Sequence, residues 1–169
     1  VIHMDLPAVT IIIAAYNEAP VLEQKIANSK AISYPQGKLK IIVITDGSTD
    51  QSAAMLSNYP DILHLHQTER KGKYAAIKRA MLEVSTELVV FTDANSMLNR
   101  DCILRMVPHY TDQKVGAVAG EKKIRTDDHP SAVGQAEGMY WQYESFMKKM
   151  DARFYTVVSG DTLSKIALS

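Results

Sequence analysis

The sequence is poor in cysteine, and Cys102 is the only one among 169 residues. A single cysteine excludes an internal disulfide and suits a reducing compartment. Cys102 follows Asn99, in what we expect to be the first turn of a helix, where the helix dipole can lower a thiol pKa. We favour a structural thiol, because no base accompanies it in the sequence. His64 and His66 could bind zinc, but with no cysteine or third histidine at a suitable spacing we favour an ordinary strand face.

An excess of charge and a long apolar run are also missing. The 19 basic residues balance the 19 acidic ones, which argues against a nucleic-acid-binding face or a polybasic membrane anchor. No window approaches the roughly 18 apolar residues of a membrane span, so we expect this chain to be soluble as given. What the chain does have is 46% hydrophobic residues, enough for one core in a domain of this length.

Several short apolar runs alternate with segments of helical periodicity. A continuous apolar run is typical of a strand covered on both faces of a parallel sheet. The alternation therefore predicts an α/β fold with a mainly parallel sheet and helices on both faces. The expected strands are Val9 to Ala15, Leu39 to Thr45, Ile62 to His66, the stretch opening at Leu88 and ending at Asn95, and Val115 to Ala119.

Helix starts are predicted from capping residues. Ser48 and Gln51 form a capping-box pattern, and Asn99 can cap the helix that follows the fourth strand. A long helix that includes Glu137 to Met150 carries an aromatic and methionine stripe. We favour packing on the sheet for this stripe over an acceptor-binding or membrane-surface role.

Polar side chains follow three of the predicted strands. In open α/β sheets the carboxyl ends of the strands hold the ligand. A ring such as that of Tyr16 can stack on a base, and a carboxylate such as that of Asp46 can accept the imide proton of uracil. Lys73 can meet a phosphate, and the oxygens of Asp93 and Asn95 can hold Mg or Mn. The inventory suits a nucleoside diphosphate.

Each of these residues also has a purely structural interpretation. Asp46 could be a turn residue, and Glu18 an acid in the first turn of a helix. Lys71 and Lys73 could form a solvated run of charge. Their shared position after strand ends is what favours a binding site.

Five segments, in the order of the chain, resemble the family 2 glycosyltransferases, which have the GT-A nucleotide-sugar-binding fold. The resemblance extends from about Val9 to Val158. The segments read Ile-Ile-Ile-Ala-Ala-Tyr-Asn-Glu, Thr-Asp-Gly-Ser-Thr-Asp, Glu-Arg-Lys-Gly-Lys, Phe-Thr-Asp-Ala-Asn and Val-Ala-Gly-Glu-Lys-Lys.

The resemblance implies a Rossmann-like GT-A fold and a metal-dependent, inverting transfer of sugar from a nucleotide-sugar, expected to be a UDP-sugar, to a glycan or lipid-linked acceptor. Asp93 and Asn95 would occupy the metal-binding D-x-D position, with Mg or Mn. Asn95 replaces the commoner aspartate, which leaves the site one charge poorer. The donor nucleotide would be bound by Ala14, Tyr16, Glu18, Asp46, Lys73 and Asp93.

The segment from Glu137 to Met150 is similar to that of cellulose-synthase-like members, which make polysaccharides at the cytoplasmic side of the cell membrane. Family members place the general base in a later Glu-Asp motif that this chain lacks. We therefore expect residues 1–158 to be the donor-binding part of a truncated catalytic domain, inactive or weakly active alone. Residues 159–169 would be a divergent tail. Tyr155 to Ala167 resembles the opening of a LysM glycan-binding repeat, and we favour a chance match or a fusion or truncation seam over a working LysM domain, because the segment is too short to fold as one.

Two other functions remain open. One is a non-catalytic nucleotide- or glycan-binding fragment. The other is a sugar-phosphate nucleotidyltransferase, which would place a glycine-rich phosphate loop after the first strand. The sequence Ala-Ala-Tyr-Asn-Glu at that point is not such a loop.

Overall fold

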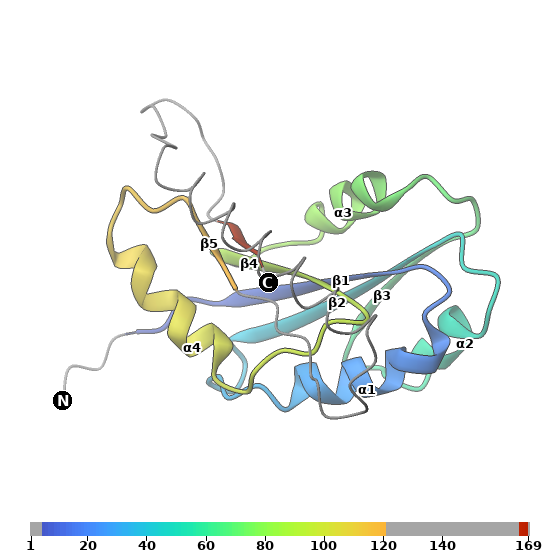
Figure 1. The fold of residues 1–169 in the computed structure, drawn as a ribbon, viewed down its shortest axis with the longest axis horizontal. Helices are drawn as coiled ribbons and strands as arrows, with labels where there is room; N and C mark the ends of the chain where they lie inside the picture. The colour runs from blue at the N-terminus through green and yellow to red at the C-terminus, as the bar shows by residue number, and fades with distance from the viewer. Residues whose placement is uncertain (1–4, 121–165, 169) are drawn as a thin grey trace, which may run out of the picture. The chain divides into compact units, whose positions relative to one another are not determined.

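The computed structural model describes residues 5–120 and the backbone of residues 166–168. Apart from Gly120 they belong to one compact unit (Figure 1). The predicted helix at Glu137 to Met150 lies outside the described residues. So does the LysM-like opening, except for the backbone of residues 166 and 167. The division into residues 1–158 and 159–169 stays a prediction.

The described strands form one parallel sheet in the order β3-β2-β1-β4-β6-β5 (Figure 1). This arrangement confirms the predicted Rossmann-like fold. Its last strand in the sequence, β6, was not predicted, and it lies between β4 and β5. The strands are β1 Val9–Ala15, β2 Leu39–Asp46, β3 Leu63–Gln67, β4 Leu88–Asp93, β5 Ala117–Ala119 and β6 Ile166–Leu168.

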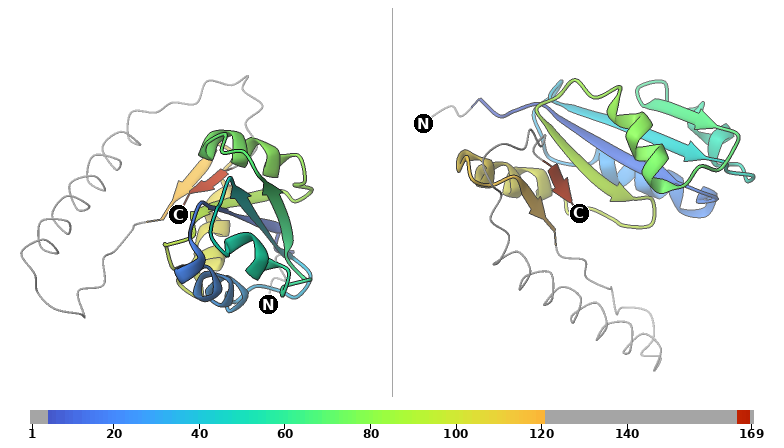
Figure 2. Two further views of the ribbon diagram at one scale, coloured as in Figure 1. Left: turned by 90° about the vertical axis from the view of Figure 1, so that its right-hand side faces the viewer. Right: turned by 90° about the horizontal axis from the view of Figure 1, so that it is seen from above.

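Helices cover both faces of the sheet, as predicted (Figure 2). Leu22, Leu56 and Ile103, from α1, α2 and α4, are buried in one core cluster. Ala76 and Ala80 from α3 are buried in the other cluster, on the opposite face. None of the helices that the structure describes is long and apolar enough to cross a bilayer. The helices are α1 Ala19–Lys30, α2 Ser52–Leu56, α3 Lys73–Met81, α4 Cys102–Met106 and the 3-10 helix η1 Val107–Thr111.

Two of the predicted caps are wrong. Helix α2 begins at Ser52 with Gln51 as its N-cap residue, and no side chain caps it. The hydroxyl of Ser48 instead accepts a hydrogen bond from the Asn17 amide at 3.2 Å, so it binds the loop after β1 rather than capping α2. Helix α4 has Asp101 rather than Asn99 as its N-cap residue.

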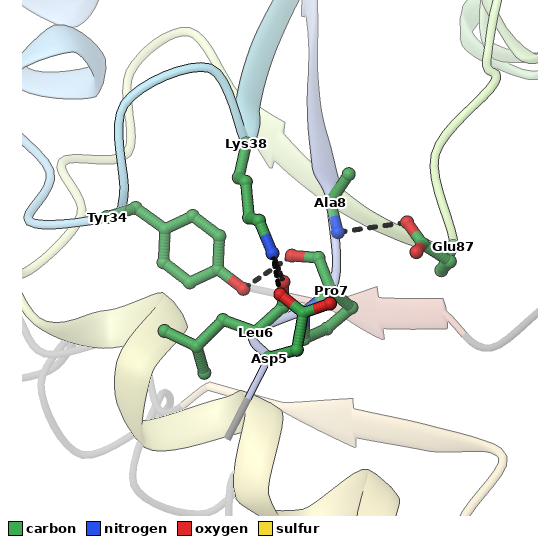
Figure 3. A network of polar contacts seen from close by, with 7 residues as sticks. All are labelled: Asp5, Leu6, Pro7, Ala8, Tyr34, Lys38 and Glu87. Carbon is green, nitrogen blue, oxygen red and sulfur yellow. Dashed lines mark hydrogen bonds and ion pairs between the residues drawn. The ribbon is translucent and has the colours of Figure 1, made fainter. Parts of the chain in front are cut away.

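At the amino end of the sheet, the segment before β1 is held by the chain that leads into β2 (Figure 3). The Tyr34 hydroxyl donates to the carbonyl of Pro7 at 2.7 Å, and the Lys38 ammonium donates to the carbonyl of Leu6 at 2.6 Å. Lys38 also forms an ion pair with Asp5, whose side chain is almost fully exposed. These contacts fasten the segment that leads into β1.

The same segment is also tied to the entrance of β4. The Ala8 amide donates to the Glu87 carboxylate at 2.9 Å (Figure 3). The Leu88 amide donates to the Ala8 carbonyl at 3.2 Å. Burial, followed by repulsion from Glu87, raises the pKa of the Tyr34 hydroxyl. The hydroxyl therefore keeps its proton, and its donated bond, well into the alkaline range.

The two histidines of β3 flank one hydroxyl on β2. The Oγ1 atom of Thr45 lies 2.9 Å from Nε2 of His64 and 2.8 Å from Nδ1 of His66. Both imidazoles thus face the neighbouring strand, as the strand-face interpretation predicts. Burial lowers the pKa of His64, and the charges of His66 and Arg79 lower it further.

Candidate functional site

The carboxyl ends of β1, β2 and β4 lie side by side because the three strands are adjacent and parallel. Ala14 is level with Ile44 on one side and with Asp93 on the other. Ala14 itself is half-buried in the strand, and the segments that follow the three strands emerge at one edge. This edge brings the predicted site residues into one region.

Asp46 ends β2 and is only 6% exposed. Its carboxylate accepts hydrogen bonds from the Lys71 amide at 3.0 and 3.1 Å and from the Gly72 amide at 2.6 Å. Gly72 is the N-cap residue of α3 and has a φ of +89°, a conformation that favours glycine. Asp46 therefore fixes the loop that starts α3, which is more than a turn residue would do.

Gly47 allows that loop to approach β2 closely. Its φ is +67°, and a Cβ atom there would lie 2.6 Å from the amide nitrogen of Arg70. The Gly47 amide donates to the carbonyl of Gln67 at 2.8 Å. Only a residue without a side chain fits between the two backbone segments.

Lys73, the first residue of α3, reaches the end of β4. Its Nζ atom lies 2.5 Å from Oδ1 of Asp93, and both side chains are about half exposed. Lys73 is therefore paired, whereas Lys71 is exposed and contributes its backbone amide. Asn95 is exposed, and its Oδ1 atom is 3.4 Å from the Ser96 hydroxyl.

Tyr16 follows β1 and is 40% exposed. The Arg70 guanidinium stacks on its ring, with Cζ 3.9 Å from the ring centroid. This cation–π contact was not predicted, and it covers one face of the tyrosine. Glu18 is the N-cap residue of α1, where its amide donates to the Ser52 hydroxyl at 3.1 Å. The Glu18 side chain makes no hydrogen bond or ion pair with another described residue, so no such contact links it to Asp46 or Asp93.

Asn17 joins the loop after β1 to the loop after β2, a role that the sequence analysis missed. Its Oδ1 atom accepts hydrogen bonds from the Thr49 amide at 2.8 Å and the Asp50 amide at 3.4 Å. In return, the Ala19 amide donates to the Asp50 carboxylate at 3.0 Å. Asn17 has a φ of +54°, which asparagine tolerates better than most residues. An asparagine two residues after the end of a strand was the available signal.

Lys25 of α1 is another missed residue, and it is completely buried. Its Nζ atom donates to Oγ1 of Thr92 at 2.8 Å and to the carbonyl of Ser96. Burial lowers the pKa of Lys25 to about 8, and the opposing attractions to Cys102 and Asp93 are smaller. The available signal was its spacing, because Lys25 falls on the face that carries the buried residues of α1.

Cys102 lies at the start of α4 and is partly buried. Burial raises the pKa of its thiol, an effect larger than the lowering by the backbone hydrogen bond at Ile103. A raised pKa keeps the sulfur protonated near neutral pH and makes it a poor nucleophile. This agrees with the structural role that we favoured.

The donor set at the end of β4 suits a hard divalent cation. Asp93 and Asn95 offer a carboxylate and an amide oxygen within three residues, both accessible to solvent. Among the described residues, no three His, Cys, Asp or Glu side chains gather closely enough to hold a metal alone. Magnesium and manganese sites commonly combine one or two carboxylates with phosphate and water oxygens. The residues present therefore fit a cation shared with a diphosphate.

Comparison with known proteins gives a family match over nearly the whole chain. The family described as Glycosyl transferase family 2 matches residues 10–164. Poly-beta-1,6-N-acetyl-D-glucosamine synthase of Staphylococcus aureus is 30% identical over 125 residues, which cover 72% of this chain and 30% of that protein. Beta-monoglucosyldiacylglycerol synthase of Nostoc sp. is 30% identical over 129 residues, 73% of this chain and 28% of that protein. The chain thus spans about a third of the length of these relatives.

Solved structures show the same fold. The mannosyltransferase PcManGT from Pyrobaculum calidifontis, in complex with GDP-Man and Mn2+, is 32% identical with a TM-score of 0.65 over 70% of this chain and 37% of that one. TarS of S. aureus, in complex with UDP-GlcNAc, has a TM-score of 0.62 over 74% of this chain and 37% of that one, at 16% identity. The likeness to TarS concerns the fold alone. From the family match and these relatives, we conclude that the chain belongs to glycosyltransferase family 2.

Proposed function

We propose that this chain is the donor-binding part of a metal-dependent, inverting glycosyltransferase that takes a UDP-sugar and a glycan or lipid-linked acceptor. The observation that carries the proposal is a continuous set of contacts along one sheet edge. Asp46 fixes the loop that starts α3, and Lys73 of that helix reaches Asp93. These contacts would link Asp46 at the base pocket to Lys73, which would bind phosphate, and to Asp93, which would bind the metal.

In this proposal, each residue has a role set by its position. Asp93 and Asn95 would hold Mg or Mn, which when bound would neutralise charge that develops on the diphosphate leaving group. Lys73 would exchange Asp93 for a phosphate oxygen. Because its ion pair with Asp93 is half exposed, the exchange would be energetically inexpensive. The proposal assigns no general base.

The nucleotide base would lie between the loops after β1 and β2. It would stack on the face of Tyr16 opposite Arg70, and the Asp46 carboxylate would accept its ring N–H. Ala14 would border this pocket, and Glu18 would line it. Uracil and guanine both carry a suitable ring N–H, whereas adenine does not, and PcManGT was solved with GDP-Man. GDP is therefore the nucleotide against which UDP has to be compared.

Several wider features belong to the same proposal. The two relatives named for a glucosamine polymer and a glycosyl lipid support a glycan or lipid-linked acceptor. Polysaccharide biosynthesis at the cytoplasmic side of the cell membrane, in a longer protein, is consistent with the first of them. Weak transfer by this chain alone would follow if the general base belongs to a segment outside it. The match to glycosyltransferase family 2 favours a glycosyltransferase over the nucleotidyltransferase alternative. The experiments below also test whether the chain is a non-catalytic nucleotide-binding fragment.

Calorimetry of the chain with UDP, with and without manganese, tests the proposal. We expect Mn²⁺ to tighten UDP binding, UDP to bind more tightly than GDP, and ADP to bind weakest. The Asp93→Ala variant should bind UDP with no manganese dependence. Asp101→Ala is the matched control, because Asp101 is an aspartate on the same loop whose partner is Arg105. Manganese dependence that survives in Asp93→Ala would contradict the assignment of Asp93 as a metal ligand. Tighter binding of GDP than of UDP would mean that the donor is a GDP-sugar.

A UDP-release assay with several UDP-sugars then separates an enzyme from a binding fragment. Slow hydrolysis in the presence of manganese, absent in Asp93→Ala, is the expected result because the bound metal would still stabilise the leaving group. Metal-dependent UDP binding without release of UDP from any UDP-sugar would favour the non-catalytic fragment.

A further inference from the structure

Lys25 lies beneath the segment that carries the candidate metal ligands. Its side chain is fully buried within the face of α1 that also buries Leu22 and Ile26. The two oxygens that it contacts belong to Thr92 and Ser96, one on each side of the three residues 93–95. A single ammonium group thus holds both flanks of the Asp93-Ala94-Asn95 segment.

A buried lysine at this position carries an energetic penalty. Burying an ammonium group removes its hydration, and its two hydrogen-bond acceptors here are uncharged. Fixing a loop does not require a charge. One turn further along α1, the neutral amide of Asn28 holds the backbone of Leu98 through two hydrogen bonds of 2.8 and 2.9 Å. The two contacts differ in their distance from the candidate metal ligands. Lys25 binds the residues directly before Asp93 and directly after Asn95, whereas Asn28 binds Leu98, three residues beyond Asn95.

Lysine has the reach and the donors that this position needs. Its side chain spans from the core face of α1 to two oxygens on opposite sides of the segment, and an ammonium group has three donors. Fixing both flanks limits the directions in which the oxygens of Asp93 and Asn95 can point. Metal affinity depends on such orientation, and loss of residues that orient ligands typically weakens metal binding about 10- to 100-fold.

We propose that Lys25 is a positioning residue that holds the Asp93–Asn95 segment in the geometry that binds the divalent cation. Lys25 does not contact the cation or the donor; it acts through the backbone of Ser96 and the side chain of Thr92. The inference rests on the proposed function, since it needs a cation at Asp93 and Asn95.

Manganese binding measured by the loss of the free Mn²⁺ EPR signal, in the presence of saturating UDP, tests this proposal. We expect Lys25→Met, which keeps the apolar stem and removes the donors, to raise the Kd for Mn²⁺ about 10- to 100-fold. Thr92→Val keeps the shape of the side chain and removes one acceptor, and it should raise the Kd by a smaller factor. Lys25→Gln, which retains two donors without the charge, should recover part of the affinity.

Asn28→Ala is the matched control for general loosening of the loop. It removes two hydrogen bonds from the same helix face to the same loop, and we expect the Kd for Mn²⁺ to change less than threefold. Each variant is also followed by thermal unfolding and by UDP binding without metal. If Lys25→Met does not fold, Thr92→Val takes its place in the comparison. Thr92→Val removes the hydrogen bond between Lys25 and Thr92 and leaves the sequence of α1 unchanged.

The outcomes separate the inference from the function on which it rests. If the native chain shows no manganese-dependent UDP binding, the proposed function fails before Lys25 is tested. If the native chain binds manganese and Lys25→Met binds it equally well or more tightly, the positioning role is wrong. Equal losses in Lys25→Met and Asn28→Ala would also overturn it, because the effect would then be general loosening.

Discussion

The two ends of the sheet are held by polar contacts of different kinds. At the amino end, the contacts involve exposed or half-buried groups such as Asp5 and Lys38, and they fasten the entrance of β1 (Figure 3). At the carboxyl end, buried groups such as Asp46 and Lys25 hold loops rather than strands. The contacts at the amino end secure strand entrances that the core already positions. The contacts at the carboxyl end position loops that have no core of their own.

This difference predicts how each end responds to substitution. Removing an exposed contact leaves groups that water can satisfy, and the measured change is small. Removing a buried acceptor leaves donors without partners, which is more destabilising and also releases a loop. Four substitutions or pairs of substitutions test the comparison, from the largest expected effect to the smallest.

The largest effect is expected for Asp46→Ala. It removes the acceptor of the Lys71 and Gly72 amides, so the free energy of unfolding should fall by about 2 to 3 kcal/mol, and nucleotide binding should be lost. Asp5→Ala, at the other end, should produce no measurable change, because the Asp5 side chain is almost fully exposed. Urea denaturation monitored by circular dichroism measures both. Equal destabilisation by the two variants would remove the distinction between the ends.

A pair of glycine substitutions isolates the close approach of the loops. Gly37, near the amino end, and Gly47 both have positive φ, at +80° and +67°. A Cβ atom at Gly37 meets nothing within 4 Å, so Gly37→Ala should cost about 1 kcal/mol of strain alone. Gly47→Ala adds a clash with the Arg70 backbone and should cost about 1 kcal/mol more than that. Similar melting temperatures for the two variants would mean that the β3–α3 loop yields easily.

A third pair separates stability from binding. Tyr34→Phe removes the hydrogen bond to Pro7, and Ser52→Ala removes the acceptor of the Glu18 amide. Each should lower the free energy of unfolding by about 1 kcal/mol. Only Ser52→Ala should weaken UDP binding, because it alone loosens a loop at the candidate site. Calorimetry beside urea denaturation checks this, and weaker UDP binding by Tyr34→Phe would contradict it.

The smallest effect is a dependence on pH that involves His64, within β3. Because the pKa of His64 is lowered from 6.5, the unfolded chain binds its proton at a higher pH than the folded protein does. The contribution of His64 to stability is therefore complete above pH 6.5 and is lost as the pH falls below it. In His64→Gln, the free energy of unfolding should fall less between about pH 7 and pH 5.

The control for this prediction lies at the amino end. Tyr34, whose pKa is raised, stays protonated across that range, so Tyr34→Phe should show the acid dependence of the native protein. Urea denaturation at each pH measures the three curves. A His64→Gln curve parallel to the native one would show that His64 does not report on folding in acid.

Most of the sheet could be predicted from the sequence because its strands are continuous apolar runs. β1 begins and ends at the predicted residues, and β4 begins at the predicted Leu88. β6 could not be predicted, because three residues carry too little pattern, and its partners are far away in the sequence. Ser48 was assigned to the wrong partner because a capping pattern is local, whereas its hydroxyl bonds Asn17 from another loop.

The site was predictable in its position and less so in its contacts. Strand ends gave Asp46 and Asp93, because parallel strands expose their carboxyl ends at one edge. The sequence could not show that backbone amides occupy the Asp46 carboxylate, or that Lys25 is buried. Both depend on the packing of loops against elements distant in the chain. Whether the predicted residues bind nucleotide and metal stays a prediction for the experiments above.

The hydrogen bonds between the loops after β1 and β2 have a consequence for hydrogen exchange. The amides of Asn17 and Ala19 are bonded to the side chains of Ser48 and Asp50, while the Thr49 amide is bonded to the side chain of Asn17. Donors on each loop thus depend on acceptors on the other, so neither loop can open alone. Although these residues lie near the surface, their amide protons should exchange with deuterium slowly and at a common rate, as one opening unit.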